Sequence, residues 1–198
     1  MSHQKTGLAL SWRLFIAIEL PEPVRRKIAE HIDRLRKELP DARASWTRQQ
    51  NIHLTLKFLG DTPVERAEAL STALKVAASN VPGFEIEISG CGAFPTPRKP
   101  GVLWIGINDS SGALQKLHEA LETECDRQGF LRDKRSFHPH LTIARLRHSH
   151  DARRLGELHQ SCAFQSMTVQ VKDACLIRSE LSPGGSRYTV IARHHVQM

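Results

Sequence analysis

With 198 residues, the chain is long enough to bury a sizeable core, and we expect one domain, 1–198, built of two lobes behind a flexible N-terminal segment, 1–11. Its longest apolar runs fall far short of the roughly 20 residues that a transmembrane helix needs, which excludes a membrane protein of that kind. A net charge of +7, from 28 lysines and arginines against 21 acidic residues, favours an anionic partner, although a solvated basic surface explains it equally well.

The four cysteines are scattered through the chain, at Cys91, Cys125, Cys162 and Cys175. They form no C-x-x-C pair, and no signal-peptide pattern precedes them. We therefore expect reduced thiols in a cytoplasmic protein, and we assign the cysteines no role in metal binding.

The first elements in chain order are a strand and a helix. Residues 13–20 are β-branched, aromatic and apolar, as buried strands are, and Pro21 ends this run. Apolar residues then recur at helical spacing up to Pro40, which predicts an amphipathic helix (Val24, Ile28, Ile32, Leu35 and Leu39).

Two further helices are marked by their ends. Thr62 as N-cap, Pro63 as first helical residue and Glu65 as capping-box partner predict a helix that starts directly after Thr62. A third helix is predicted over 111–128, where Gly129 provides a C-terminal stop.

The remaining segments favour strands and turns. Strict alternation over 84–89 and 167–172 predicts half-buried strands, and the continuous apolar run 102–107 predicts a central one. A last strand is expected over 188–196. Segments rich in proline and glycine predict two loops, 94–101 and 182–186.

One pattern occurs twice, in H-L-T-L and H-L-T-I, almost half a chain apart. Side chains two apart on a strand share a face, so His53 is expected beside Thr55, and His140 beside Thr142. The intervening apolar residues are then expected to face the core (Leu54, Leu56, Leu141 and Ile143). If the two strands lie near each other, they line a pocket with two imidazoles and two hydroxyls.

Such a pocket suits attack on phosphorus. One imidazole accepts a proton while the other donates one to the leaving alkoxide, and no metal is needed. Threonine hydroxyls can donate to the non-bridging phosphoryl oxygens as charge shifts in the transition state. One H-x-T pair is a weak signal, since most histidines on half-buried strands are structural, but a second pair strengthens the interpretation.

The order of several segments resembles that of the 2H phosphoesterases, and within them of the bacterial and archaeal RNA 2′,3′-cyclic phosphodiesterases once described as 2′-5′ RNA ligases. The resemblance covers about residues 12–192 and includes both motifs ("RLFIAIELPEPVR", "NIHLTLKFLGD", "FPTPRKPGVLWIGI", "FHPHLTIAR" and "LIRSELSPGGSRYTVI"). It implies an α+β fold that is bilobal and pseudo-twofold symmetric, with two antiparallel sheets, outer helices and a central cleft that holds both motifs.

The resemblance also implies hydrolysis of a 2′,3′-cyclic phosphate at an RNA or nucleotide end to a 2′-phosphate, without a metal or other cofactor. By analogy His140 activates water and His53 protonates the departing 3′-oxygen, while Thr55 and Thr142 bind the phosphate. A weak 2′-5′ RNA ligase activity is the chemical reverse. We expect RNA ends or such nucleotides as partners, and a monomeric protein.

Three residues near the motifs have open roles. Arg145, five positions after His140, points away from the histidine face by strict alternation, yet a strand bulge would bring it to the phosphate. Two roles stay open for it, a clamp on the phosphate and a solvated surface charge. Phe58 faces the wrong way by the same rule, so core packing is expected more than stacking on a base. Lys57 has the right parity but is expected to be solvated.

Two rival interpretations assign the chain to other classes of protein. Histidine pairs suggest a metal-dependent phosphohydrolase, but Pro139 separates the first pair and no ligand set of familiar spacing accompanies them (His138 with His140, His148 with His150, His194 with His195). A non-catalytic RNA-end binding module is the main alternative, although binding alone would not require both H-x-T pairs. No phosphate-binding or dinucleotide glycine motif is present, and a basic cluster before the second motif is either an RNA contact or a solvated loop (Arg132, Lys134 and Arg135).

Overall fold

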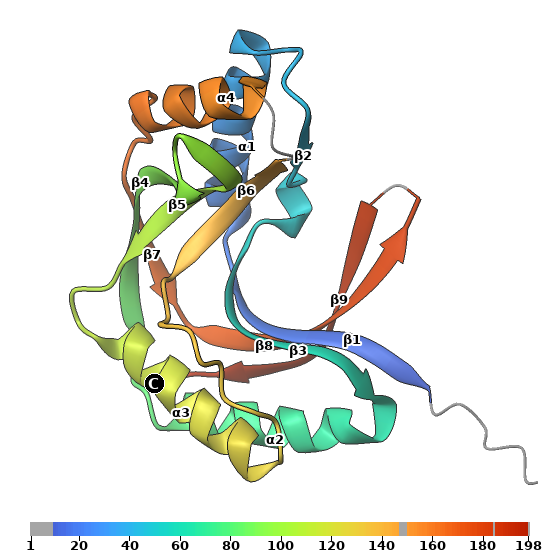
Figure 1. The fold of residues 1–198 in the computed structure, drawn as a ribbon. Helices are drawn as coiled ribbons and strands as arrows, with labels where there is room; N and C mark the ends of the chain where they lie inside the picture. Colours follow the sequence, from blue (N-terminus) through green and yellow to red (C-terminus); the bar gives the residue numbers. More distant parts are fainter. Residues whose placement is uncertain (1–9, 147–149, 184, 198) are drawn as a thin grey trace, which may run out of the picture.

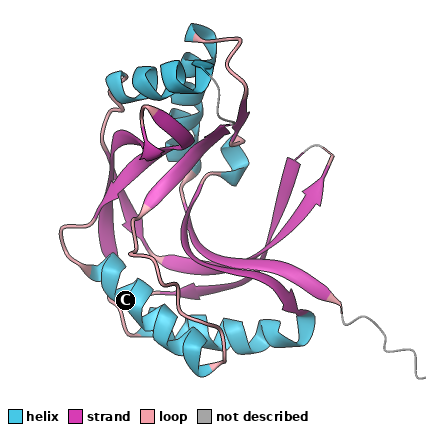
Figure 2. Cartoon of the chain, in the orientation of Figure 1, coloured by secondary structure: helices cyan, strands magenta, loops and turns pink. Residues whose placement is uncertain are grey.

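The computed structural model describes residues 10–146, 150–183 and 185–197. They form two antiparallel sheets and four α-helices, with the strands in the middle of the molecule and the helices at its two ends (Figures 1 and 2). The helices are α1 (Glu22–Glu38), α2 (Ala67–Ser79), α3 (Ala113–Arg127) and α4 (His150–Ser161). The expected α+β fold is therefore confirmed.

The first sheet has four strands in the order β3-β1-β8-β9. Helices α2 and α3 pack against each other and cover this sheet at one end of the molecule (Figure 1). Its strands are β1 (Ser11–Glu19), β3 (His53–Pro63), β8 (Asp173–Ser182) and β9 (Gly185–His195).

The second sheet has five strands in the order β2-β6-β5-β4-β7. Helix α4 packs on β4 and β5, and α1 lies against α4 at the opposite end of the molecule (Figure 1). Its strands are β2 (Ala44–Trp46), β4 (Phe84–Thr96), β5 (Lys99–Asn108), β6 (His140–Leu146) and β7 (Met167–Val171). Because α1 follows a strand of the first sheet and α3 a strand of the second, the chain crosses between the lobes and ties them together.

The two histidine strands lie where the sheets meet. Strand β3 is the edge of the first sheet, β6 is followed only by the short β2 at the edge of the second, and β3 and β6 contact each other. The alternating residues of both motifs are buried as predicted (Leu54, Leu56, Leu141 and Ile143). Each strand thus anchors one face in the core and leaves the other for the space between the lobes.

The predicted helix ends have different outcomes. Helix α3 ends as expected: Gly129 has a φ of +77°, and the amides of Gly129 and Phe130 bond the carbonyls of Asp126 and Cys125, which is a Schellman motif. The predicted capping box is wrong. Thr62 lies within β3 and its hydroxyl donates to the Gly60 carbonyl, so a 3₁₀ turn, Val64–Arg66, precedes α2.

The predicted loop at 94–101 is also wrong in extent. Strand β4 runs on to Thr96 and β5 begins at Lys99, so these residues form the tip of a long hairpin. The predicted loop at 182–186 is likewise too long, because β8 runs to Ser182 and β9 begins at Gly185. Strand β2, strand β8 and helix α4 have no counterpart among the sequence predictions, and residues 1–9 lie outside the described residues, with β1 beginning at Ser11.

Candidate active site

A cavity of about 350 Å³ lies between the two sheets. His53 and Thr55 line it from β3, and His140 and Thr142 line it from β6. The fold therefore brings together the four residues that the repeated motif singled out. Among its described lining residues there is no carboxylate and no thiol, so the donors around it are imidazoles, hydroxyls, amides and guanidinium groups.

The His53 imidazole is held at both nitrogens. Nδ1 lies 2.7 Å from the Asn51 carbonyl oxygen, which can only accept, so Nδ1 carries a proton. Nε2 of the neutral ring is then an acceptor, and it lies 2.9 Å from Oγ1 of Thr55, which donates to it. Protonation of Nε2 would reverse this bond and free the threonine hydroxyl to donate elsewhere.

The His140 imidazole repeats the first half of this arrangement. Its Nδ1 donates to the His138 carbonyl at 2.7 Å, again two residues earlier in the chain. The same backbone contact therefore fixes the same tautomer in both rings and leaves both Nε2 atoms as the reactive positions.

A β-bulge follows each threonine. Leu56 has no partner in the register of β3 with β1, and Ile143 has none in the register of β6 with β5. Each extra residue reverses the alternation that follows it. The residue five after each histidine, Phe58 or Arg145, is therefore returned to the histidine face, and both line the same cavity.

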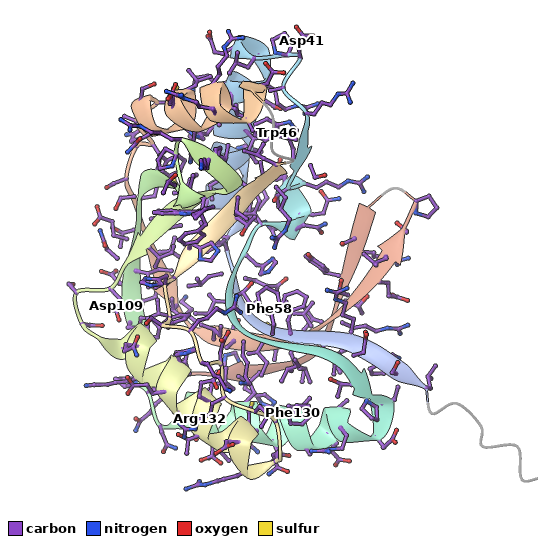
Figure 3. The ribbon with its side chains drawn as sticks, viewed as in Figure 1. Asp41, Trp46, Phe58, Asp109, Phe130 and Arg132 are labelled. Atoms are coloured by element: carbon purple, nitrogen blue, oxygen red, sulfur yellow. The ribbon has the colours of Figure 1, made fainter. Side chains whose placement is uncertain are left out.

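Both bulges correct predictions made from simple alternation. Phe58 is not a core residue: it is 66% exposed, and Figure 3 shows it near the middle of the molecule. Lys57 is not solvated, because the bulge turns it to the core side, where it is 5% exposed and pairs with Glu122 of α3 at 2.8 Å. The bulge also turns Arg145 toward the cavity, which it lines together with His140 and Thr142.

Electrostatics distinguish the two imidazoles. Burial lowers the pKa of His53 from its ordinary value, the bond to Asn51 and the nearby carboxylate of Glu19 oppose this, and the nearby His140 adds to the decrease. Burial also lowers the pKa of His140, the bond to His138 opposes it, and the nearby charge of Arg145 adds to the decrease. Burial is the largest of these effects for both rings, so both surroundings favour the neutral imidazole.

The family is decided by comparison with known proteins. The family model for the 2'-5' RNA ligase superfamily matches residues 24–183. This chain belongs to that superfamily.

Relatives within the superfamily match most of this chain. A protein of Methanothermobacter thermautotrophicus named RNA 2',3'-cyclic phosphodiesterase is 33% identical over 89% of this chain and 95% of its own. One of the same name from Thermotoga maritima is 31% identical over 90% of this chain and 92% of its own. The crystal structure of E. coli LigT complexed with 3'-AMP superposes with a TM-score of 0.76, at 27% identity, over 96% of this chain and all of that one.

Aromatic rings surround both histidines of this superfamily member. Phe15 and Tyr188 lie against the His53 ring, with centroids 4.9 and 5.4 Å away, and Phe94 meets the His140 ring edge-on at 5.1 Å. Sequence reasoning missed these residues, because they come from three other strands and carry no motif of their own. They desolvate the imidazoles and restrict their rotation.

The described histidines of the other pairs have contacts of their own. His138 contributes its carbonyl to His140, and the His194 ring lies 2.8 Å from the Ser71 hydroxyl on the far side of the first sheet. His148 lies outside the described residues. The basic cluster before β6 is exposed, and Arg135 pairs there with Asp133 at 2.9 Å.

In the described part of the chain, no helix is both long and apolar enough to cross a bilayer.

Proposed function

We propose that this protein hydrolyses 2′,3′-cyclic phosphates at RNA or nucleotide ends to 2′-phosphates, by acid-base catalysis between His53 and His140. The observation that carries the proposal is the single cavity into which both H-x-T pairs project from separate sheets. The family, and the name that its relatives in Methanothermobacter and Thermotoga bear, support the substrate class.

In the proposed reaction, Nε2 of neutral His140 takes a proton from water as the water oxygen attacks phosphorus. The bond between phosphorus and O3′ breaks, and protonated His53 gives the proton on its Nε2 to O3′. Two neighbouring charges agree with these roles, since Glu19 raises the pKa of His53 and Arg145 lowers that of His140. Neither step draws on a metal or other cofactor.

Thr55, Thr142 and Arg145 are proposed to hold the phosphoryl oxygens. Once His53 is protonated, Nε2 no longer accepts from Thr55, so the threonine hydroxyl proton is free to point at the substrate while the Nε2 proton is available for O3′. Thr142 and Arg145 line the cavity from β6, and a guanidinium there would stabilise the charge of the transition state. Weak 2′-5′ RNA ligation, a monomeric state and a cytoplasmic location belong to the same proposal.

The test is turnover of a 2′,3′-cyclic nucleotide in the presence of EDTA, followed by separation of 2′- from 3′-monophosphate. We expect the wild type to form the 2′-monophosphate, and His53→Ala and His140→Ala to lower kcat by roughly 10²–10⁴-fold each. His195→Ala is the matched control, because this histidine is exposed on β9, and it should leave kcat unchanged.

Three results would count against the proposal. Undiminished turnover in either His53→Ala or His140→Ala would rule out the two-histidine mechanism. Dependence on an added metal would favour the metal-dependent phosphohydrolase. A wild type that binds RNA ends in the same buffer but forms no product would be the non-catalytic binding module.

A further inference from the structure

A second group of histidines lies outside the catalytic cavity, on the far side of the second sheet. His31 of α1 and His159 of α4 are 1% and 0% exposed, and Cys91 of β4 lies partly buried beside them. Among the described residues, this is the one grouping of three histidine, cysteine or acidic side chains whose ligand atoms all lie within 4.8 Å of one another. The proposed function uses none of them.

The spacing of the three ligand atoms fits one small cation. Nε2 of His31 lies 3.1 Å from Nδ1 of His159 and 3.9 Å from Sγ of Cys91. Around a tetrahedral zinc ion, two nitrogens are about 3.4 Å apart and a nitrogen and a sulfur about 3.6 Å, from bond lengths of roughly 2.05 and 2.3 Å. The two distances from His31 therefore lie within about 0.3 Å of these edges, and the third pair of atoms lies within 4.8 Å.

The surroundings supply features of a metal site. Nε2 of His159 donates to the Trp104 carbonyl at 2.9 Å, which orients Nδ1 toward the cluster and is the outer contact that metal-bound histidines usually make. Cys91 is partly exposed, so water can reach an open fourth position, as in other zinc sites with three protein ligands.

A hydrogen-bonded chain without a metal is the competing account. Arg34 lies 3.2 Å from Nδ1 of His31, so the guanidinium donates there, His31 donates to His159, and His159 donates to Trp104. Every ring nitrogen in this chain has a partner. In this account the Cys91 thiol donates to the Cys162 carbonyl at 3.2 Å and only approaches His31, at 3.9 Å, so the thiol is not part of the chain.

Zinc binding would change the protons of this chain in a defined way. Burial raises the pKa of the Cys91 thiol to about 11, so the metal must displace its proton, and one proton leaves to solvent. The proton on Nε2 of His31 moves to Nδ1, and the exposed Arg34 side chain turns outward. Affinity should therefore fall as the pH is lowered.

We propose that His31, Cys91 and His159 bind one zinc ion, which ties α1, β4 and α4 together. Zinc binds imidazole and thiolate ligands more strongly than magnesium or calcium does. The ion would take no part in the proposed reaction at the H-x-T pairs, because the cluster is separate from the cavity that they line.

The test uses untagged full-length protein, stripped with a chelator and titrated with zinc. We expect one zinc ion per chain, release of a proton, and a rise in Tm of about 5–10 °C at a free zinc concentration of about 100 Kd. Cobalt in place of zinc should give a thiolate-to-metal charge-transfer band. Cys91→Ser should abolish this band and weaken zinc binding by about 100-fold or more.

Cys175→Ser is the matched control, because that cysteine is also buried but lies on β8 of the first sheet. It should keep the stoichiometry, the affinity and the cobalt band. His159→Gln is a second cluster variant, chosen because its amide can still donate to Trp104, and it should lose the zinc response while remaining folded by circular dichroism. Absence of stoichiometric zinc, or equal binding by Cys91→Ser, would overturn the proposal in favour of the hydrogen-bonded chain.

Discussion

Replacing Glu122 by leucine should destabilise the protein and also slow catalysis. The Glu122 carboxylate accepts from Nζ of Lys57 at 2.8 Å and from the Asp133 amide at 3.0 Å, and Lys57 also donates to the Leu131 carbonyl at 2.9 Å. Both side chains are almost fully buried, with 3% and 7% exposure. The pair joins β3, which carries His53, to the segment that leads into β6.

The expected cost follows from what the substitution leaves behind. Without Glu122, the buried ammonium of Lys57 retains only one carbonyl partner, and the amide of Asp133 loses its acceptor. Breaking one side of a buried ion pair typically costs about 3–5 kcal/mol. For a chain of this size, roughly 2–4 °C of Tm per kcal/mol gives a fall of roughly 6–20 °C.

The assay is urea and thermal unfolding of Glu122→Leu, Lys57→Met and the double variant. Because the double variant has no unpaired buried charge, it should be more stable than Glu122→Leu by about 2 kcal/mol. Glu119→Leu is the matched control on the exposed side of α3 and should change stability by less than about 0.5 kcal/mol. A cost below about 1 kcal/mol for Glu122→Leu, or strict additivity in the double variant, would refute this reasoning.

Four shorter predictions concern the two histidine clusters and their neighbours. Phe58→Ala should raise KM for nucleotide substrates by roughly 5–100-fold with little change in Tm, measured by kinetics and melting, because the exposed ring is placed to stack on a base. Arg145→Gln should lower kcat/KM by roughly 10–100-fold in the same assay. The profile of kcat/KM against pH should be bell-shaped with its maximum below pH 6.5, because burial lowers the pKa of both His53 and His140. Activity should fall on the acid side as His140 gains a proton, and on the alkaline side as His53 loses one. Burial and neighbouring charge lower the pKa of His31 to about 4, so the unfolded state binds more protons than the folded state between pH 6.5 and 4. About 3 kcal/mol of stability that is present above pH 6.5 should therefore be lost by pH 4 in the metal-free wild type. Urea unfolding should show no such loss in His31→Leu.

Local patterns predicted the elements that depend on local chemistry. The helical spacing that begins at Val24 and the stop at Gly129 match α1 and α3, because amphipathic periodicity and a left-handed glycine act within a few residues. The capping box at Thr62 failed for a tertiary reason. Strand β1 pairs with β3 as far as Pro63, and this pairing extends the strand past the point where a helix was expected to begin.

The residues of the candidate active site were readable from the sequence because the motif is short and repeated. His53 with Thr55 and His140 with Thr142 are two apart, and alternation on a strand is enough to place each pair on one face. Alternation could not place Phe58 or Lys57. The bulge at Leu56 arises from the pairing of β3 with β1, and it exchanges the faces of Lys57 and Phe58.

The sequence by itself determined the two H-x-T pairs, the apolar residues that anchor them and the class of fold. Only the tertiary structure decided that β3 and β6 meet at one cavity, that Phe58 and Arg145 turn into it, and that His31, Cys91 and His159 converge elsewhere. The physical reason is the distance along the chain over which each kind of interaction acts. Strand alternation and helical spacing act over a few residues, whereas strand register and contacts between residues far apart in the chain exist only once the sheets and helices have packed.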